Sequence, residues 1–485
     1  MLFRSISKIT TGTIPMNLKE PKYDVIILGA GIGGLICGAF LAKNGKKTLL
    51  IEQHYLPGGY CTSFKRKGFT FDAAVHHIGG CGTWSIVGRC LKELGIDIRF
   101  VQLDPMDSLN FPTFSVDVPA DLDDYVKVLQ NNFVSESNNI SAFFKEFVGL
   151  YRSTVRTKES QILAKYKDLT YKEMLDIFFT DERLKMVLSA QWGYIGSPPH
   201  EASAIGMCQM LVNYLKDGAF YPLGSTQNFA DAITQKFIDY GGRIMLSSKV
   251  EKILTKDMLV KGVITDRGEK YHADQFVSNI DPGQTFFTLL DNQEIDAAYL
   301  QKIRTMKEST SFFLLYLGLG NKIDLKDLKR GFYHTSGGTS CSESEWFYIS
   351  VPTKVDANLA PDGKQIITVV VSLSEHFDEI GNFDAFKEKM TKHTMNFLET
   401  LVPDIRNHVD VIETGTPRTL KRYTLNSKGA AYGWAVTVDQ TWSNRLPHTT
   451  PFKNLFLAGH WTNPGPGICA VVSSGWGVAN MILNN

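Results

Sequence analysis

The chain has 485 residues, of which 43% are hydrophobic and 21% charged, an ordinary balance for a globular protein. Its length suits two sequential or interleaved domains better than a single core. The net charge of +1 gives no large field of one sign, so nucleic acid is not an expected partner. Seven cysteines without a Cys-x-x-Cys pair argue against a zinc ribbon or a disulfide framework and favour a reducing, cytoplasmic setting.

Residues 1–21 precede the first predicted strand. Their basic and hydroxyl side chains, with no acid before Glu20, partly resemble a transit peptide, but no amphipathic repeat is present. We therefore interpret this segment as a flexible extension, with a targeting role left open. No apolar run approaches the roughly 20 residues that a membrane span needs.

A nucleotide site is predicted directly after this extension. Residues 25–28 read as a strand buried on both faces, residues 35–43 as a helix and residues 48–51 as a second strand. Gly29, Gly31 and Gly34 between the first strand and the helix fit G-x-G-x-x-G, with Gly33 beside the third glycine. The first glycine makes a tight turn, the second lets a pyrophosphate approach, and the third lets the helix pack on the strand. Glu52, followed by Gln53, ends the second strand where a carboxylate accepts from ribose hydroxyls.

The stretch after Glu52 favours FAD over NAD. Gly58 and Gly59 leave bare backbone where a ligand can lie close, and a hairpin is predicted from residues 62–65 and 69–73. No second complete G-x-G-x-x-G follows, so we expect a single, tightly held FAD and no separate nicotinamide site.

Two adjacent histidines, His76 and His77, come next. If they continue the strand, their side chains point to opposite faces and cannot share a metal ion, and no zinc-like spacing supports one. One interpretation is an interior histidine with a neighbour that packs outside. The other places His76 near the flavin or the pocket entrance, where it orients substrate or supplies a proton.

The middle of the chain is predicted to be largely helical and then to return to strands. Helical spacing covers residues 121–133, 140–156, 171–179 and 200–214, a cap that either packs on itself or lines an apolar tunnel through Met207, Met210 and Leu211. Later strands are expected at residues 243–250, 309–317, 365–373 and 454–457, a turn that leads into a helix at 218–242, and helices at 383–401 and from Ile468. Residues 322–362 are expected to be a loop at an entrance, and the strands on either side of it a second sheet that forms the cavity floor.

Several of these motifs together resemble a known superfamily. The stretches GAGIGG, PGGYCTSF, GFTFDAAVHHIGG, GAFYPLGSTQNFADAI, VSNIDP and LFLAGHWTNPGPGICAVVSSG are similar to the phytoene desaturase-type flavoproteins, closest to the carotenoid isomerase and retinol saturase branch. The resemblance implies an α/β fold of the GR2-like, amine-oxidase-like class. It comprises a Rossmann-type FAD-binding domain and an interleaved substrate domain of helices and mixed sheet. It also implies noncovalent FAD and a lipophilic polyene substrate that is desaturated, saturated or isomerised at a membrane surface, with the electron partner unassigned.

The resemblance also suggests roles for particular residues. His76 matches the family's F-D-x-G-x-H-x-x-G stretch, Tyr60 stands where relatives have an arginine, and His460 stands where many have an aspartate. The candidate catalytic residues are His76, Tyr432 and Trp461. The candidate cofactor-binding residues are Gly29, Gly31, Gly33, Gly34, Glu52, Gln53, Gly58, Gly59, Tyr60, His77, Val250, Gly459, His460, Gly467 and Ile468.

These expectations divide the chain into interleaved segments. The FAD-binding domain is assigned residues 22–100, 216–300 and 406–485, and the substrate domain residues 101–215 and 301–405. Two other functions stay open, a flavin amine oxidase and a flavin-containing pigment carrier. A monotopic membrane contact through an apolar patch of the helical cap is expected in each polyene case.

Overall fold

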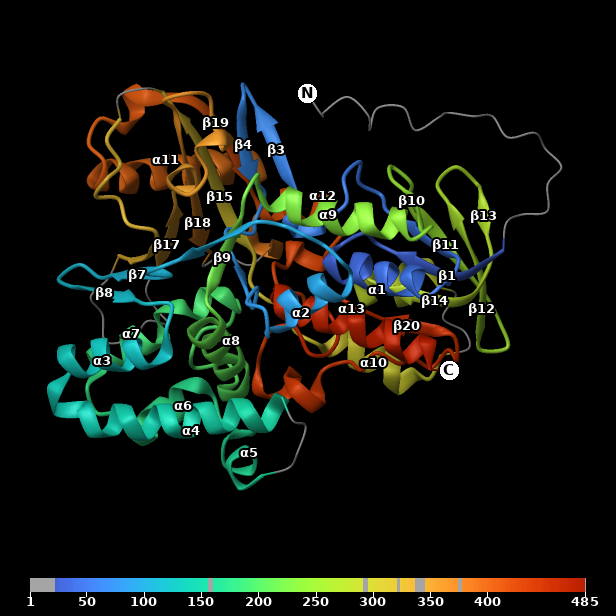
Figure 1. Ribbon diagram of the computed structural model, residues 1–485, viewed down its shortest axis with the longest axis horizontal. Helices are drawn as coiled ribbons and strands as arrows, with labels where there is room; N and C mark the ends of the chain where they lie inside the picture. Colours follow the sequence, from blue (N-terminus) through green and yellow to red (C-terminus); the bar gives the residue numbers. More distant parts are fainter. Residues whose placement is uncertain are drawn as a thin grey trace.

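The computed structural model describes residues 22–155, 160–290, 295–320, 323–335, 345–373 and 377–484. Two large sheets make up the body, with a helical cap on one side of the seven-stranded sheet (Figure 1). The expected extension at residues 1–21 lies outside the described residues. No helix in the ranges given above is long and apolar enough to cross a membrane.

The five-stranded sheet is parallel throughout and collects strands from both ends of the chain. Its order is β10 (Arg243–Met245), β2 (Thr48–Ile51), β1 (Tyr23–Leu28), β14 (Ala273–Ser278) and β20 (Leu455–Leu457). Because helices or a second sheet cover each face, β1, β2 and β20 are mostly apolar runs with almost no alternation.

Three helices from distant parts of the sequence cover one face of this sheet. They are α1 (Ile32–Lys43), α9 (Thr226–Asp239) and α13 (Ile468–Leu483), whose buried residues share one apolar core with Val25, Ile27 and Leu50. A three-stranded antiparallel sheet, β11 (Val250–Lys256), β12 (Leu259–Thr265) and β13 (Lys270–Tyr271), lies against the other face. The nucleotide-binding half is therefore a three-layer structure.

The second large sheet has seven strands. Its order is β19 (Val409–Gly415), β15 (Phe312–Leu319), β18 (Gln365–Ser372), β17 (Trp346–Ser350), β16 (Gly331–His334), β7 (Asp107–Asn110) and β8 (Ser115–Val118). Strands β16 and β7 run parallel to each other, and all other neighbouring strands of this sheet are antiparallel. β19 lies within residues 406–485, the segment assigned from the sequence to the FAD-binding domain. In the structure it pairs with β15 of the seven-stranded sheet.

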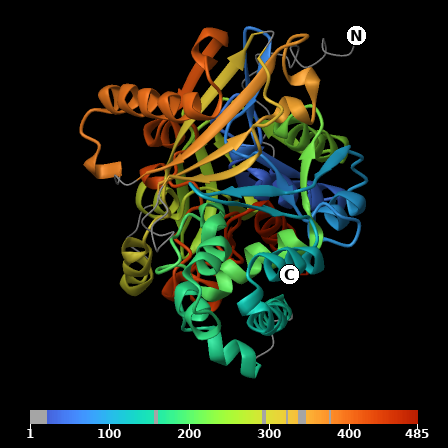
Figure 2. The same cartoon turned by 90° about the vertical axis from the view of Figure 1, so that its left-hand side faces the viewer.

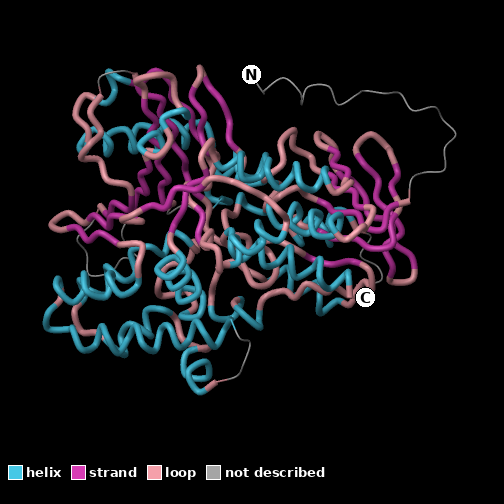
Figure 3. Tube along the Cα trace, viewed as in Figure 1, coloured by secondary structure: helices cyan, strands magenta, loops and turns pink. Residues whose placement is uncertain are grey.

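The alternating side chains of β15 show how this sheet separates two cores. Phe313, Leu315 and Leu317 pack toward α11 (Phe383–Leu401), whereas Phe312 and Leu314 pack into the core shared with the cap. Figure 2 views this sheet between α11 and the cap, and in Figure 3 its strands lie between two groups of helices.

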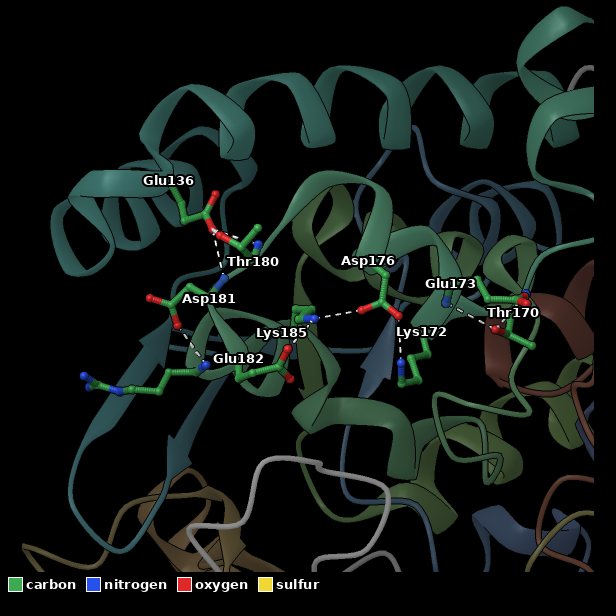
Figure 4. A network of polar contacts seen from close by, with 10 residues as sticks. Glu136, Thr170, Lys172, Glu173, Asp176, Thr180, Asp181, Glu182 and Lys185 are labelled. Atoms are coloured by element: carbon green, nitrogen blue, oxygen red, sulfur yellow. Dashed lines mark hydrogen bonds and ion pairs between the residues drawn. The ribbon is translucent and has the colours of Figure 1, made fainter.

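The cap consists of α3 (Leu122–Asn132), α4 (Ser137–Val155), α5 (Gln161–Tyr166), α6 (Tyr171–Phe178), α7 (Glu182–Ser189) and α8 (Ala204–Asp217). A polar network ties its outer helices together (Figure 4). Glu136, which is buried, accepts hydrogen bonds from Thr180 and from the backbone N–H of Asp181 at 3.0 Å. Asp176 bridges Lys172 and Lys185. Because the Asp176 pairs are partly exposed, the buried glutamate contributes more to fixing α7 against α4 than they do.

Smaller elements connect these parts. They are the hairpin β3 (Ser63–Arg66) and β4 (Phe69–Asp72), the sheet of β5 (Ile78–Gly79), β9 (Ala219–Pro222) and β6 (Phe100–Leu103), and the helices α2 (Ile86–Glu93), α10 (Ala297–Thr305) and α12 (Pro417–Thr424).

Two sequence predictions about the fold are wrong. The strand expected at residues 243–250 is two strands in different sheets, because Ser247 at φ 51° turns the chain between β10 and β11. The loop expected at 322–362 contains β16 and β17, both buried inside the seven-stranded sheet, since its aromatic residues outweigh the polar composition around them. Residues 322 and 336–344 of that range lie outside the described residues.

Candidate functional site

A cavity of about 280 Å³ lies between the two large sheets. Both ends of the chain line it, since its wall includes Gly29 and Gly31 of the first glycine turn and Gly459 and Gly467 of the last. One end is built from backbone and a few polar side chains. The other is built from aromatic and aliphatic side chains of the second sheet and the cap.

The first glycine turn has no room for side chains at Gly29 and Gly34, because neighbouring atoms lie very close to its backbone. Gly29 has φ 93°, and a Cβ there would lie 2.8 Å from Ile280. A Cβ on Gly34 would lie 2.2 Å from the carbonyl oxygen of Gly29, so the third glycine packs α1 onto β1 as predicted and does not line the cavity.

The last glycine turn meets the first. A Cβ on Gly33 would lie 3.1 Å from the Cα of Gly459, and 2.6 Å from the side chain of Asn279. The Nδ2 atom of Asn279 also donates to the carbonyl of Gly29 at 3.2 Å. Asn279, at the end of β14, therefore holds both turns at the same edge of the sheet. Sequence reasoning quoted its motif but did not select the residue.

The second glycine pair lies on top of the first turn. The backbone N–H of Gly58 donates to Ala30 at 2.8 Å, and a Cβ on Gly59 would lie 3.3 Å from the Cα of Gly31. Tyr60 follows at the cavity wall, where its hydroxyl donates to the carbonyl of Ala430 at 2.8 Å. Burial raises the pKa of Tyr60 to about 12, so this tyrosine is a neutral hydrogen-bonding group.

Two helix amino ends open into this part of the cavity. Gly31 is the N-cap of α1 and Gly467 is the N-cap of α13, and neither cap supplies a side-chain hydrogen bond. Ile468, the first residue of α13, lines the cavity beside Gly467. Free N–H groups and the positive helix ends together favour negatively charged groups at both places.

Glu52 stands at the carboxyl end of β2. Its two carboxylate oxygens accept from the backbone N–H groups of Ala30 at 2.7 Å and His54 at 2.8 Å. Burial raises the pKa of Glu52, and these backbone hydrogen bonds oppose that rise. Gln53 and Val250 also line the cavity here. The predicted ribose and adenine residues are therefore gathered at one end.

The residues at this end fit FAD. The bare backbone of the glycine turns leaves room for a pyrophosphate, the two helix ends favour its charge, and Glu52 lies next to the first turn. His460 adds a further sign of fit at the cavity wall. Among the described residues its buried Nε2 atom has no hydrogen-bond partner, so a bound group can supply one. Burial, with the charge of Arg445, lowers the pKa of His460 to about 3 and keeps it neutral.

The two histidines lie at the other end of the cavity, and the strand that would point them to opposite faces does not extend to them. β4 ends at Asp72, so residues 73–77 are not in a strand, and the rings of His76 and His77 are 4.6 Å apart. Both line the cavity. Burial lowers the pKa of His76 to about 3 and that of His77 well below the usual value, so both are neutral.

Around the histidines the cavity wall is apolar and aromatic. Phe312 and Leu314 of β15 and Val370 of β18 reach it from the second sheet, as the expected cavity floor. Tyr432 lines it from the segment after α12. The cap contributes Tyr214 of α8, whereas Met207 and Leu211 are buried in the cap's own core. For these two residues, the structure therefore supports the interpretation that the cap packs on itself, and not the interpretation that they line an apolar tunnel.

Trp461 lies behind the cavity wall. It is buried against Trp434, with ring centroids 4.7 Å apart, and its indole N–H donates to the side chain of Asn426 at 3.3 Å. Asn426 does line the cavity and donates to the Tyr60 hydroxyl at 3.1 Å. Trp461 thus contacts the site through Asn426 and through the ring of His460, whose centroid lies 5.3 Å from its own.

A buried polar cluster next to the histidines was missed by sequence reasoning. It consists of Asp107, Gln191, Tyr194 and Tyr348, joined by hydrogen bonds to the aspartate. Its members come from β7, the short helix at Ala190–Tyr194 and β17. Nothing in the sequence signals that such distant segments meet.

Comparisons with known proteins agree with this site. A family model described as flavin containing amine oxidoreductase matches residues 32–483. Prolycopene isomerase 1 of an Oncidium hybrid cultivar is 24% identical, over 94% of this chain and 82% of that protein. All-trans-retinol 13,14-reductase of Danio rerio is 25% identical, over 90% of this chain and 82% of that protein. These similarities confirm the predicted resemblance to the carotenoid isomerase and retinol saturase branch.

A solved structure gives the same answer for the fold. The crystal structure of an oxidoreductase from Methanosarcina mazei aligns with a TM-score of 0.70 at 18% identity, covering 94% of this chain and all of that one. The expected α/β class with a Rossmann-type nucleotide half is confirmed. The chain, an FAD-dependent oxidoreductase, belongs to the flavin-containing amine oxidoreductase family.

Proposed function

We propose that this protein acts on carbon–carbon double bonds of a lipophilic polyene, a carotenoid or a retinoid, as an oxidoreductase or isomerase. The observation that carries the proposal is the apolar end of the cavity, formed by Phe312, Leu314 and Val370 together with aromatic rings. Prolycopene and retinol, named in the titles of two relatives, are both polyenes. A hydrocarbon needs shape and dryness from such a wall and few polar partners.

The chain's own residues position the reactants and control charge. Bound FAD accepts or donates a hydride at its isoalloxazine ring. The amino end of α13 stabilises negative charge near Gly467, and the apolar wall excludes water from the polyene. His76 and Tyr432 at the wall remain our candidate catalytic residues, and Trp461 a positioning residue that acts through Asn426.

Amine oxidation is a weaker proposal, because an ammonium group would lack a counter-charge. Of the described residues that line the cavity, Glu52 is the carboxylate, and it lies beside the first glycine turn, away from the apolar wall. Release of peroxide on adding simple amines would revive this alternative.

The test is product analysis on purified yellow protein. We expect heat to release FAD, and incubation with a carotenoid and retinoid panel, with oxidised and separately with reduced flavin, to change a polyene. Net gain of double bonds, net loss, or only a cis/trans shift would identify a desaturase, saturase or isomerase. Stoichiometric pigment binding without any conversion under either condition would instead indicate a carrier and refute the proposed catalysis.

We further propose a cytoplasmic enzyme in peripheral contact with a membrane, because polyenes are nearly insoluble in water. Exposed apolar side chains such as Trp84, which is 87% exposed, and Val134 of the cap suit such contact. Flotation with liposomes should carry the protein upward, and Trp84→Ala should weaken that flotation. Protein that stays at the bottom of the gradient at low and high salt would contradict the proposal.

A further inference from the structure

A buried carboxylate lies just behind the histidine end of the cavity. Asp107, the first residue of β7, is 0% exposed. Its Oδ2 atom accepts from the side-chain amide of Gln191 and from the hydroxyl of Tyr194, each at 2.7 Å, and its Oδ1 atom accepts from the hydroxyl of Tyr348 at 3.3 Å. These three donors offset part of the cost of burying the carboxylate and hold it in a fixed position.

A second contact connects this carboxylate with the cavity. The hydroxyl of Tyr348 is also 3.4 Å from the Nδ1 atom of His77, and His77 lines the cavity. The ring of His76 stacks on the ring of Tyr348 with centroids 4.0 Å apart, which fixes the phenol between its two partners. The side chains therefore form a chain from the core to the cavity wall, in the order Asp107, Tyr348, His77.

The charges around the chain suit proton movement. Burial raises the pKa of Asp107 to about 6, while the positive charge of Arg330 and the three hydrogen bonds oppose the rise. Burial raises the pKa of Tyr348 well above its usual value, and burial and Arg330 lower that of His77. The other titratable groups that face the cluster are neutral, namely Tyr125, Tyr194, Tyr214 and His76. Asp107 is thus the member that gains and loses a proton near neutral pH, and the others pass it on.

We propose that Asp107 is the proton reservoir of the reaction, and that Tyr348 and His77 carry the proton between it and the polyene. This inference rests on the proposed function. Desaturation removes a hydride and a proton from adjacent carbons, and the C–H electron pair becomes the new π bond. Bound FAD would supply the hydride acceptor, and the proton passes to Nε2 of His77. The Nδ1 proton of His77 then moves to the Tyr348 oxygen, and the Tyr348 hydroxyl proton moves to the Asp107 carboxylate. Saturation is the same transfer in reverse.

The experiment compares holoenzyme variants on the polyene that the wild type converts. We expect Asp107→Asn and Tyr348→Phe to lower kcat by about 100-fold or more, the usual contribution of a positioned acid or base. KM and bound FAD should stay within about twofold, because the Asp107 carboxylate lies behind the wall. In the wild type, kcat for desaturation should rise with pH through the Asp107 titration, or fall for saturation. In Asp107→Asn this dependence should disappear, and Asp107→Glu should restore part of it.

Tyr333→Phe is the matched control, because Tyr333 lies on the neighbouring strand β16 but belongs to the core that packs against α11. It should behave as wild type. In D2O the saturation product should carry a solvent deuteron at the carbon that receives the proton, and a product without deuterium at that carbon would overturn the relay. So would an Asp107→Asn enzyme that retains the wild-type kcat and pH dependence.

A measurement that needs no substrate separates this inference from the proposed function. Infrared difference spectra of the wild type should show a protonated-carboxyl band that titrates near neutral pH and is absent in Asp107→Asn. If the wild type converts no polyene, the proposed function fails, whatever this band shows. If a polyene is converted but the band is missing, only the relay fails. If Asp107→Asn does not fold, the kcat of Tyr348→Phe and the pH titration of the wild-type infrared band still test the relay.

Discussion

Glu52 connects the strand β2 with the first glycine turn, at the end of the cavity where we propose that the nucleotide binds. Its carboxylate accepts from two backbone N–H groups, and hydrogen bonds to a charged acceptor are worth about 1.5–3 kcal/mol each. We predict that Glu52→Gln raises the Kd for FAD by about tenfold or more, which corresponds to about 1.4 kcal/mol. Fluorescence titration of the apoprotein measures it. Glu93→Gln on α2, an exposed partner of Lys43, should leave the Kd unchanged; equal effects of the two substitutions would contradict the role of Glu52.

Arg330 tunes the buried carboxylate from the other side. Its guanidinium donates to the backbone carbonyls of Pro105 and Met106, next to Asp107, and its charge lowers the pKa of Asp107. Removing the charge in Arg330→Gln should therefore move this pKa above about 6. For desaturation, the rise of kcat with pH should then occur at higher pH. For saturation, kcat should stay high up to a higher pH before it falls. Arg330→Lys keeps the charge and should shift the profile less. A profile unchanged in Arg330→Gln would show that this charge does not act on Asp107.

Individual site residues differ in how far the sequence could predict them. The glycines at 29, 31 and 33 and Glu52 were predictable, because a strand, a turn and a helix follow each other within one short stretch with fixed spacing. Asp107 was not, because its partners Gln191 and Tyr348 lie 84 and 241 residues away in the chain. Asn279 could have been selected, since a polar residue directly after a buried parallel strand lies at the ligand-binding edge.

The helices α1 and α13 pack together through small residues. A Cβ on Gly475 would lie 2.2 Å from the carbonyl oxygen of Gly33, whereas a Cβ on Gly477 would meet only a side chain at 3.8 Å. We predict that Gly475→Ala destabilises the protein by about 1–3 kcal/mol, as overpacking does, and weakens FAD retention because Gly33 must shift. Gly477→Ala on the same helix should be neutral or slightly stabilising. Thermal unfolding with and without FAD measures both, and equal melting temperatures would contradict close packing of the two helices.

The elements themselves show why some predictions succeeded and others did not. β1, β2, α1 and α13 were predictable because their apolar runs and glycines are local signals. β16 and β17 were not, because their aromatic side chains lie in a polar stretch and their pairing partners β7 and β18 come from elsewhere in the sequence. β19 likewise follows a long helix and returns to β15, a pairing that no local pattern indicates.

At the scale of the whole molecule, the FAD site depends on segments more than 400 residues apart. The turn at residues 29–34 and the turn at 459–468 share one sheet edge, where a Cβ on Gly33 would lie 3.1 Å from the Cα of Gly459. The apolar wall opposite comes from the second sheet, whose strands also derive from separated segments. The apolar end of the cavity therefore needs both halves of the molecule, whereas the cofactor end needs the first and last glycine turns to share one sheet edge.

This dependence predicts a specific pattern of hydrogen exchange. A ligand at 1,000 times its Kd stabilises the state that binds it by about 4 kcal/mol. Adding FAD to the apoprotein should slow amide exchange in the first and last turns together, because one molecule contacts both. ADP alone should protect the first turn and β2 but not residues 459–468, since it lacks the isoalloxazine end. The strands β17 and β18, shielded by neighbours on both sides, should change little with either ligand. Protection of the first turn alone by FAD would show that the carboxy-terminal turn does not hold the cofactor.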